Sequence, residues 1–267
     1  MDVLQGLNIF YKLVSWVGSL FWKKKNIIYL NSNKKNCNFD DICRSRCVNP
    51  NDAKVINIGK ELPLHFKFLK SHFKRMQFHL YQIKRNLKHH DYFVYGGFVS
   101  PMFAVFDGMQ IGNTIKTEFV CYDNSTNSYY SIDYHRKSSN SPSGVDFSGF
   151  EGQEINIVVS STYKIAPTKY DSTIRTFEFD ERLNDKVTDE YLQKVYEFVE
   201  SVLVGTQTTN IRKINLYISA KQPICFVIGT AIEERHPEIE VYEFDGNKYA
   251  YSLNLKTYKI RSIDCAN

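Results

Sequence analysis

The amino-acid sequence predicts an α/β protein with two pseudo-repeated lobes and an added helical segment at its N-terminus. Three observations lead to this fold class. The chain has 267 residues, of which 43% are hydrophobic, so it can build a substantial core. Short β-prone runs alternate with helical patterns after residue 91. One set of these elements also occurs twice in the same order.

The first predicted element is a helix over residues 3–22, an apolar stretch that contains Lys12 and is followed by three lysines. Its spacing fits an amphipathic helix, and its length also suits a bilayer, although a central lysine costs about 2.5–3.5 kcal/mol there. Three interpretations remain open: a helix packed on protein, a membrane span and a helix lying on the membrane surface. The stretch lacks the basic start and small-residue cleavage site of a secretory signal.

Residues 31–60 are polar and predict a loop-rich connector. A long helix follows Pro63, because apolar residues recur at spacings of three and four: Phe66, Leu69, Phe73, Met76, Leu80, Ile83 and Leu87. Most of its lysines fall outside this seam. His65, His72 and His79 share a neighbouring face, which is either a solvated boundary stripe or a basic face for phosphate or an acidic partner.

The remainder of the chain predicts strands and helices in alternation. Strands are expected at residues 92–95, 118–122, 129–134, 155–160, 214–219, 240–244 and 249–255. Pro101 and Pro223 open two helices. Thr188 caps a third helix, which begins at Asp189 and ends at Gly205.

The internal repeat aligns residues 91–132 with residues 213–254 at a constant offset of 122. The identical pairs are Tyr95 with Tyr217, Pro101 with Pro223, Val105 with Val227, Glu118 with Glu240, Asp123 with Asp245 and Tyr129 with Tyr251. Each copy reads strand, short loop, proline-initiated helix, strand, turn and strand. Two strand-to-helix junctions therefore belong to one molecule, and such junctions offer oriented N–H groups to anions and nucleotides.

The net charge of +5 is unevenly distributed. Residues 1–90 hold 17 Lys and Arg against 5 Asp and Glu, a balance of +12, which leaves 17 against 24, a balance of −7, for the remainder. Five of the seven histidines also lie in the first 90 residues. We interpret this as a basic helical layer beside an acidic repeat.

The cysteines and the enzyme motifs give little support to catalysis. Cys121 and Cys225 lie in apolar runs and are expected to be buried free thiols, whereas Cys37, Cys43 and Cys47 are either reduced thiols or zinc ligands of an uncommon spacing. No phosphate-binding loop, dinucleotide fingerprint, zinc-protease, serine-hydrolase or deaminase motif is present. We expect a binding protein without cofactor or metal.

Several of these segments resemble a known family. Residues 216–229, with their proline-started helix ending in Gly229, and residues 239–245, with a Tyr-centred motif, resemble the closing half of a SAVED domain. Residues 95–104 resemble its opening half, and residues 155–161 the strand between them. The glycine of Asp107-Gly108 departs by one position from Gly229. The resemblance spans about residues 60–267 and implies two fused CARF-like, Rossmann-type units.

The resemblance also implies a function in bacterial antiphage defence of the CBASS or CRISPR kind. Such domains bind cyclic oligonucleotide messengers and oligomerise to activate an effector. Carried over by position, the ligand contacts would be Gly96, Gly97, Ser100, Ser160, Ser161, Ser219, Lys221 and Gln222, with Tyr163, Lys164, His135 and Arg136 as further candidates for base stacking or phosphate contact. Each glycine and serine could instead serve only a turn.

We therefore expect residues 1–60 to form an N-terminal helix and connector for membrane contact or assembly, and residues 61–267 to form the sensor, as two pseudo-repeats over about 61–150 and 151–267. The expected partners are a cyclic di-, tri- or tetranucleotide, a second copy of the chain and a separate effector. The expected location is the cytoplasm, with attachment to the inner membrane face through residues 3–25 left open. Alternatives are an RNA- or DNA-binding module using the basic helix over residues 64–88, and a membrane-anchored scaffold; cleavage of the ligand also remains open.

Overall fold

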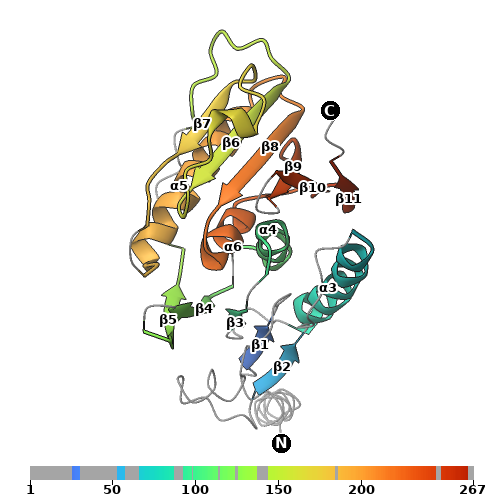
Figure 1. The fold of residues 1–267 in the computed structure, drawn as a ribbon, viewed down its shortest axis with the longest axis vertical. Coiled ribbons are helices and arrows are strands. Elements are labelled where there is room, and N and C mark those ends of the chain that lie inside the picture. The colour runs from blue at the N-terminus through green and yellow to red at the C-terminus, as the bar shows by residue number, and fades with distance from the viewer. Residues whose placement is uncertain are drawn as a thin grey trace, which may run out of the picture.

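The computed structural model describes residues 26–30, 53–57, 66–86, 93–97, 99–113, 115–123, 126–136, 144–183, 186–244 and 248–263. It has two β-sheets with helices between and beside them (Figure 1). The first sheet has four parallel strands and one antiparallel edge strand. Its order is β2 (Ala53–Asn57), β1 (Asn26–Leu30), β3 (Phe93–Gly96), β4 (Thr117–Asp123) and β5 (Ser128–Tyr134).

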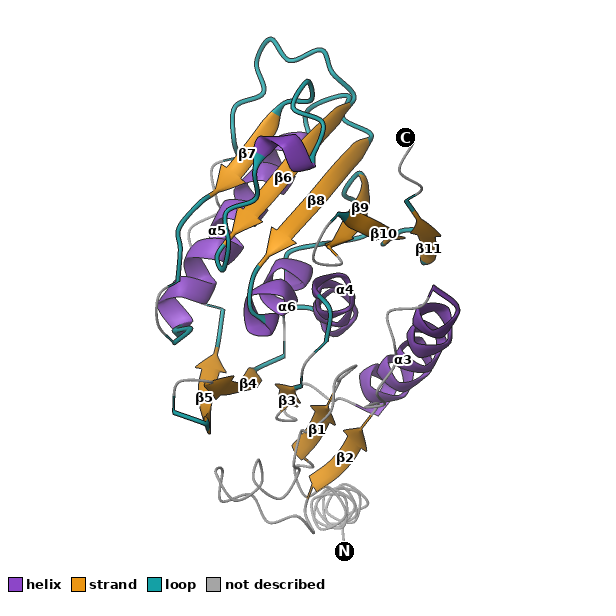
Figure 2. Cartoon of the chain, viewed as in Figure 1, coloured by secondary structure: helices purple, strands orange, loops and turns teal. Residues whose placement is uncertain are grey.

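The second sheet repeats this pattern and adds one strand. Its order is β11 (Lys259–Ser262), β10 (Tyr249–Asn254), β9 (Glu238–Phe244), β8 (Lys213–Ser219), β6 (Glu154–Ser160) and β7 (Thr176–Phe179). The helices are α3 (Phe66–Asn86), α4 (Pro101–Ile111), α5 (Asp189–Thr206) and α6 (Gln222–Thr230), with a short 3-10 turn η2 at Pro167–Lys169. Figure 2 shows α4 and α6 in the layer between the sheets.

The duplication is larger than the sequence repeat. The order β1, β2, α3, β3, α4, β4, β5 corresponds element by element to β6, β7, α5, β8, α6, β9, β10, and the strand orders of the two sheets correspond as well. The predicted α/β fold with two pseudo-repeated lobes is therefore confirmed. The sequence repeat contains only the second part of each unit, in which the identical residues lie.

Most predicted elements are confirmed, and the differences lie mainly at the N-terminal side. The segment predicted to be a loop-rich connector contains β2, and β1 precedes it; both strands pair with the sheet of the first lobe. Strands β7 and β11 were also not predicted. Residues 3–22 lie outside the described residues, as do Cys37, Cys43, Cys47 and His65. No helix in the part of the chain that the structure describes is long and apolar enough to cross a bilayer.

Helices α4 and α6 cross at a pair of glycines. A Cβ atom on Gly108 would lie 1.9 Å from the carbonyl oxygen of Phe226, and one on Gly229 would lie 2.0 Å from that of Val105. These reciprocal contacts relate the helices by an offset of 121, as do the N-cap residues Ser100 and Lys221. Gly108 and Gly229 are therefore structural equivalents, and it is the proline that differs by one position between the copies.

Both central helices contact the sheet of the other lobe. Phe226 of α6 packs against three aromatic residues of the first sheet, with ring centroids 4.4 Å from Tyr95, 5.3 Å from Phe119 and 6.3 Å from Phe93. The backbone N–H of Met102 in α4 donates to the carboxylate of Glu243 on β9, at 3.3 Å. The two lobes consequently share one continuous hydrophobic core.

The outer helices pack on the central pair, α3 on α4 and α5 on α6. The predicted seam of α3 is confirmed, since Leu69, Phe73, Met76, Leu80 and Ile83 are buried. Thr188 caps α5 as predicted, because its hydroxyl accepts from the backbone N–H of Tyr191 at 3.2 Å.

His72 departs from the expected boundary stripe. It is only 3% exposed, and its ring lies 5.5 Å from that of Phe103. Burial, assisted by the charge of Arg75, lowers the pKa of His72 to about 4. The side chain is thus a neutral part of the core, and it does not belong to a basic face.

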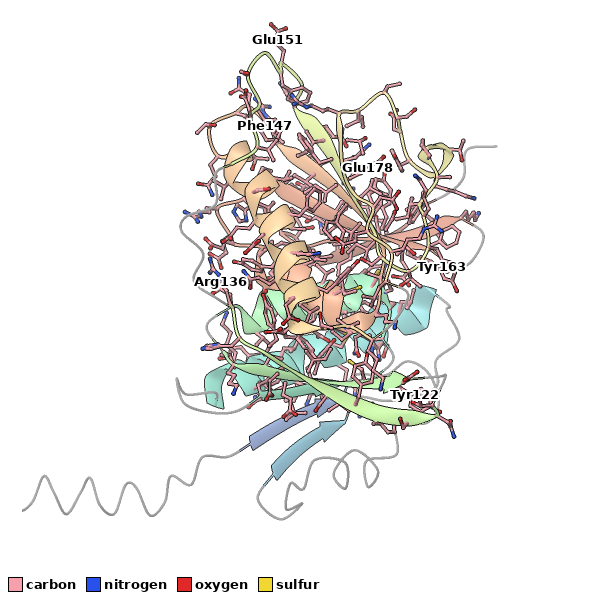
Figure 3. All side chains as sticks on the ribbon, turned by 90° about the vertical axis from the view of Figure 1, so that its left-hand side faces the viewer. Tyr122, Arg136, Phe147, Glu151, Tyr163 and Glu178 are labelled. Atoms are coloured by element: carbon pink, nitrogen blue, oxygen red, sulfur yellow. The ribbon has the colours of Figure 1, made fainter. Side chains whose placement is uncertain are left out.

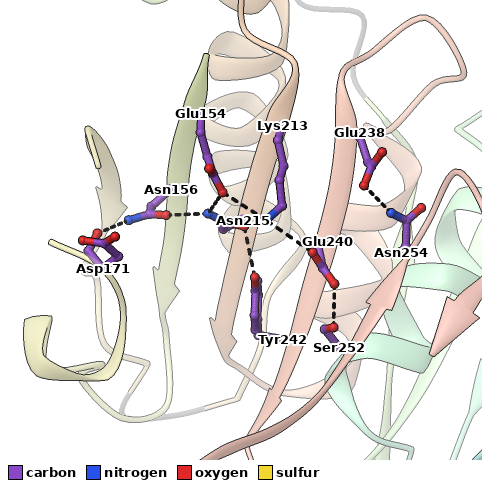
Figure 4. A network of polar contacts seen from close by, with 10 residues as sticks. All are labelled: Glu154, Asn156, Asp171, Lys213, Asn215, Glu238, Glu240, Tyr242, Ser252 and Asn254. Carbon is purple, nitrogen blue, oxygen red and sulfur yellow. Dashed lines mark hydrogen bonds and ion pairs between the residues drawn. The ribbon is translucent and has the colours of Figure 1, made fainter. Parts of the chain in front are cut away.

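A network of polar side chains lies on the face of the second sheet that points away from α6 (Figure 4). The ammonium group of Lys213 pairs with the carboxylates of Glu154 at 3.0 Å and Glu240 at 3.4 Å. The amide of Asn215 donates to Glu154 and Asn156, and the hydroxyl of Tyr242 donates to Asn215. The network joins β6, β8 and β9 side by side and so fixes the strands whose far ends lead into the loops described below.

The glycine crossing predicts that Gly108→Ala and Gly229→Ala each destabilise the protein by roughly 3 kcal/mol or more, because the added methyl group meets backbone atoms that cannot move aside. Urea denaturation, monitored by circular dichroism, measures the change in the free energy of unfolding. Lys194→Ala, on the exposed face of α5, is the control and should cost less than about 1 kcal/mol. Glycine variants as stable as this control would contradict the assigned crossing.

The buried His72 predicts a loss of stability on acidification. The unfolded chain protonates this residue below about pH 6.5, whereas the folded protein resists protonation until about pH 4. The free energy of unfolding should therefore fall between these pH values, by up to roughly 3 kcal/mol from this residue. His72→Phe should make the pH profile flatter; profiles that remain parallel would show that His72 is accessible to protons.

Candidate ligand-binding junctions

Two strand-to-helix junctions contain most of the predicted site residues. The first junction comprises the end of β3 and the start of α4, with Gly96, Gly97 and Ser100. The second junction comprises the ends of β6 and β8, the loop after β6 and the start of α6, which are residues 160–164 and 219–222. Because the strands are parallel, both junctions lie at carboxyl ends of strands, where α/β proteins bind ligands.

Hydrogen bonds bring the residues of the second junction together. Ser160 and Ser219 end adjacent paired strands. The carbonyl oxygen of Ser219 accepts from the backbone N–H groups of Ser161 and Thr162, at 2.9 and 2.8 Å, and its hydroxyl accepts from that of Tyr163 at 3.0 Å. The hydroxyl of Ser160 accepts from the backbone N–H of Ile165. These serines therefore fix the loop, as the turn interpretation predicts.

The exposed members of the second junction include an aromatic ring and two lysines. Tyr163 is 76% exposed, so its ring is available for stacking. Lys221 is exposed at the N-cap of α6. Lys164 lies 2.9 Å from Asp180, and this carboxylate raises the pKa of the ammonium group. Lys164 is thus already paired within the chain.

Both helix starts contain a buried polar atom that has no hydrogen-bond partner. These atoms are the hydroxyl oxygen of Ser100, a residue that is 7% exposed, and the amide nitrogen Nε2 of Gln222. They occupy adjacent positions of the repeat, since Ser100 is the N-cap of α4 and Gln222 the first residue of α6. Buried polar atoms are rarely left without a partner, so a bound molecule is a physical explanation for both.

The backbone of the first junction explains its glycine pair. Gly97 has a φ of 125°, which residues with a side chain rarely adopt. Gly96 is buried at the end of β3, in register with Leu30 of β1. Glycine at these positions allows the backbone to turn sharply at the end of β3 and to continue toward the start of α4.

Glu243 on β9 interacts with residues of both central helices. Its carboxylate accepts a hydrogen bond from the backbone N–H of Met102 in α4. Burial raises the pKa of the Cys225 thiol in α6, and the negative charge of Glu243 raises this pKa further. Glu243 is only 5% exposed. This buried carboxylate is therefore bonded to the start of α4 and adds its charge to the surroundings of α6. Cys121 and Cys225 are buried free thiols, as predicted.

Arg136 and His135 are not brought to the junctions. Arg136 follows β5 of the first lobe and pairs at 2.8 Å with Glu200 on α5 of the second, with its guanidinium 4.8 Å from the ring centre of Tyr196. Figure 3 shows Arg136 and Tyr163 on opposite sides of the molecule. Arg136 therefore joins the two lobes. The adjacent His135 is exposed.

A cavity of about 620 Å³ lies at the other ends of the central helices. Residues after the carboxyl ends of α4 and α6 line it, including Gly112 and Ile232, together with Lys84 and Tyr258. It is therefore separate from both junctions. Among the residues that the structure describes, no three His, Cys, Asp or Glu side chains are grouped so that they could hold a metal ion.

Comparison with known proteins identifies the family. The model of the SMODS-associated and fused to various effectors sensor domain matches residues 77–256, which is more than half of the chain. The chain belongs to the SAVED family. This match contains both junctions, all of α4 and α6, and the eight strands from β3 to β10; β11 follows it.

Solved structures share the fold at low sequence identity. The Acinetobacter baumannii Cap4 SAVED/CARF-domain containing receptor with the cyclic trinucleotide 2′3′3′-cAAA aligns with a TM-score of 0.56 and 13% identity, over 93% of this chain and 55% of that one. The same receptor with 3′3′3′-cAAA gives 0.54 and 13%, over 91% and 54%. The receptor structure whose description names no ligand gives 0.55 and 14%, over 93% and 53%. The SAVED chain thus spans about half the length of these receptors. No curated protein matches it.

Two contributors to the junctions were missed by sequence reasoning. Tyr191 lies in the helix predicted to begin at Asp189, with no role at a junction, yet its hydroxyl lies 2.8 Å from the hydroxyl of Ser161 and donates to the carbonyl oxygen of Glu181. Glu243 was assigned a strand role. No pattern in the sequence shows that a buried carboxylate on β9 reaches α4, since the two residues concerned are 141 positions apart.

The contacts of Tyr191 predict that Tyr191→Phe loosens the second junction. The variant leaves the hydroxyl of the buried Ser161 and the carbonyl oxygen of Glu181 without this partner and should cost about 1–3 kcal/mol. Hydrogen exchange at the amide of Leu183, which donates to the carbonyl of Ser161, should become faster. Tyr170→Phe removes an exposed hydroxyl contact to Glu178 and is the matched control. Equal exchange in both variants would contradict this role.

Proposed function

We propose that this SAVED domain is an antiphage-defence sensor that binds a cyclic oligonucleotide at the two junctions. The observation that supports the proposal most directly is the pair of unpartnered polar atoms, on Ser100 and Gln222, at the equivalent helix starts of the repeat. A cyclic ligand with repeated phosphates and bases suits two facing copies of one unit. The Cap4 receptors of similar fold carry cyclic trinucleotides in two of their structures.

The two junctions have different roles in this proposal. The start of α6 combines the positive end of a helix dipole with Lys221 and the amide of Gln222, so a phosphate is expected there. The start of α4 already donates to the Glu243 carboxylate, which repels a second phosphate. Ser100 is then expected to contact a sugar or base. Tyr163 supplies an exposed ring on which a base can stack.

Ligand binding is proposed to be followed by self-association of the chain and activation of a separate effector. The chain covers about half of the Cap4 receptors, so the effector and the activity of the whole protein are part of the proposal. The ion pair between Arg136 and Glu200 contributes to self-association only indirectly, because it holds together the two lobes of one chain. No cofactor is invoked.

The proposal predicts that Lys221→Ala weakens binding of the preferred cyclic di-, tri- or tetranucleotide about 10- to 100-fold, the range of one charge-assisted hydrogen bond. Isothermal titration calorimetry measures the affinity. Lys256→Ala is the matched control, because Lys256 lines the cavity at the opposite ends of the helices and should leave the affinity unchanged.

The same titration separates this function from its alternatives. The sensor should bind a cyclic oligonucleotide much more tightly than the linear form of equal length and sequence. Equal affinity for both forms, with a steep fall in affinity as salt increases, would support a general nucleic-acid-binding module and overturn the proposal.

A further inference from the structure

Three buried polar atoms lie together where the edge of the first lobe meets α5 of the second. They are the hydroxyl oxygen of Tyr134, Nε of Arg136 and Oε2 of Glu200, and none has a hydrogen-bond partner among the described residues. We call this contact, which also includes Tyr196, the seam. Figure 3 shows Arg136 beside α5. The proposed ligand contacts do not involve the seam, so its unpartnered atoms need a separate explanation.

The ion pair between Arg136 and Glu200 holds only one of the two hydrogen bonds that its groups can form. Oε1 of Glu200 accepts from Nη2 of Arg136 at 2.8 Å and from the hydroxyl of Tyr196 at 2.9 Å. Within the part of the chain that the structure describes, Oε2 accepts no hydrogen bond and Nε donates none. In a guanidinium group, Nε–H and one Nη–H point the same way and fit the two oxygens of one carboxylate. A small displacement of β5 relative to α5 would therefore make the pair bidentate.

Tyr134 adds a second donor to the seam. Burial, together with the nearby Tyr196, raises the pKa of Tyr134, so its hydroxyl keeps its proton and can donate. A carboxylate oxygen can accept more than one hydrogen bond. Oε2 of Glu200 is consequently able to satisfy both Nε of Arg136 and the hydroxyl of Tyr134, and the same displacement would satisfy all three atoms.

Helix α5 connects the seam to the second junction. Near its start, the hydroxyl of Tyr191 lies 2.8 Å from that of Ser161 in the junction loop. Glu200 follows nine residues later, about 14 Å along the helix axis. Because a helix moves largely as one piece, a shift of the junction loop relative to the first lobe also shifts Glu200 relative to Arg136. The seam is polar and can adjust, whereas the crossing of α4 and α6 is held by close backbone contact.

We propose that Arg136 and Glu200 are positioning residues for the ligand site. A cyclic oligonucleotide that contacts both junctions draws the two lobes together, and in that arrangement the pair between Arg136 and Glu200 becomes bidentate. The added hydrogen bonds stabilise the arrangement of lobes that the ligand requires, so the seam and the ligand site strengthen each other. This inference rests on the proposed function and gives a role to residues that do not touch the ligand.

The test combines ligand affinity with a direct observation of the Arg136 side chain. Calorimetry on the full chain uses the tightest binder from a panel of cyclic di-, tri- and tetranucleotides. NMR of the protein labelled with ¹⁵N-arginine follows the Nε–H signal that disappears in Arg136→Lys. Arg136→Lys keeps the charge without the fork of donors, and Glu200→Gln keeps one oxygen acceptor. Thermal melts report whether each variant is folded.

The ligand should slow exchange of the Arg136 Nε–H with water by roughly tenfold or more, because a hydrogen-bonded proton exchanges only when the bond opens. Arg136→Lys and Glu200→Gln should each weaken ligand binding by about fivefold or more, the lower end of the range for coupled sites. The double variant should bind no more weakly than either single variant, because both changes remove the same hydrogen bond.

Arg235→Lys is the matched control. The ion pair of Arg235 with Glu233, at 2.8 Å, lies within one loop of the second lobe and does not join the lobes. This variant should change the affinity less than about twofold, since a surface ion pair of this kind contributes little.

Three results would overturn the inference while the sensor function stands: both seam variants bind the ligand as tightly as the wild type, Arg235→Lys weakens binding as much as they do, or Nε–H exchange does not respond to ligand. An Nε–H that exchanges slowly before ligand is added belongs to the third case, because its hydrogen bond then exists already. If the wild type binds no cyclic oligonucleotide, the proposed function and the inference both fail.

Discussion

The close approach of α4 and α6 at Gly108 and Gly229 is the constraint on which the rest of the structure depends. Each glycine lies against a backbone carbonyl of the partner helix, and a methyl group at either position would overlap it. Only this approach lets both helices fit into one layer between the two sheets. Phe226 can then pack against the first sheet while Met102 reaches the second. Two units that could have been separate domains become one body with a shared core.

The junctions owe their arrangement to this crossing. Each central helix begins at a junction of its own lobe, so the packing of the two helices in the core sets the relative position of the junctions. The duplication also makes the site unequal. A symmetric pair of helix starts would offer two similar anion sites, whereas the single carboxylate on β9 is bonded to α4. The two helix starts are therefore chemically different, although they occupy equivalent places in the repeat.

The distribution of charge has a different origin. The network on the second sheet pairs its own lysine with two carboxylates, so these charges interact mainly with one another. Of the two outer helices, α3 carries six basic residues and no acidic one, whereas α5 carries four acidic residues and one lysine. Because the duplication places these helices on opposite sides of the central pair, the uneven charge of the sequence appears on two equivalent helices of different composition.

The sequence by itself determined the α/β class, the internal repeat, the seam of α3, the cap at Thr188 and the glycine and serine residues of the junctions, because each of these follows from local spacing or turn chemistry. It did not reveal β1 and β2, whose short runs lie within a polar segment, and it left α4 and α6 misaligned by one position. Only the tertiary structure decided that Gly108 and Gly229 meet, that His72 is buried, that Arg136 joins the lobes and that Glu243 reaches α4. These features depend on contacts between residues far apart in the chain, and such contacts leave no periodic signal in the sequence.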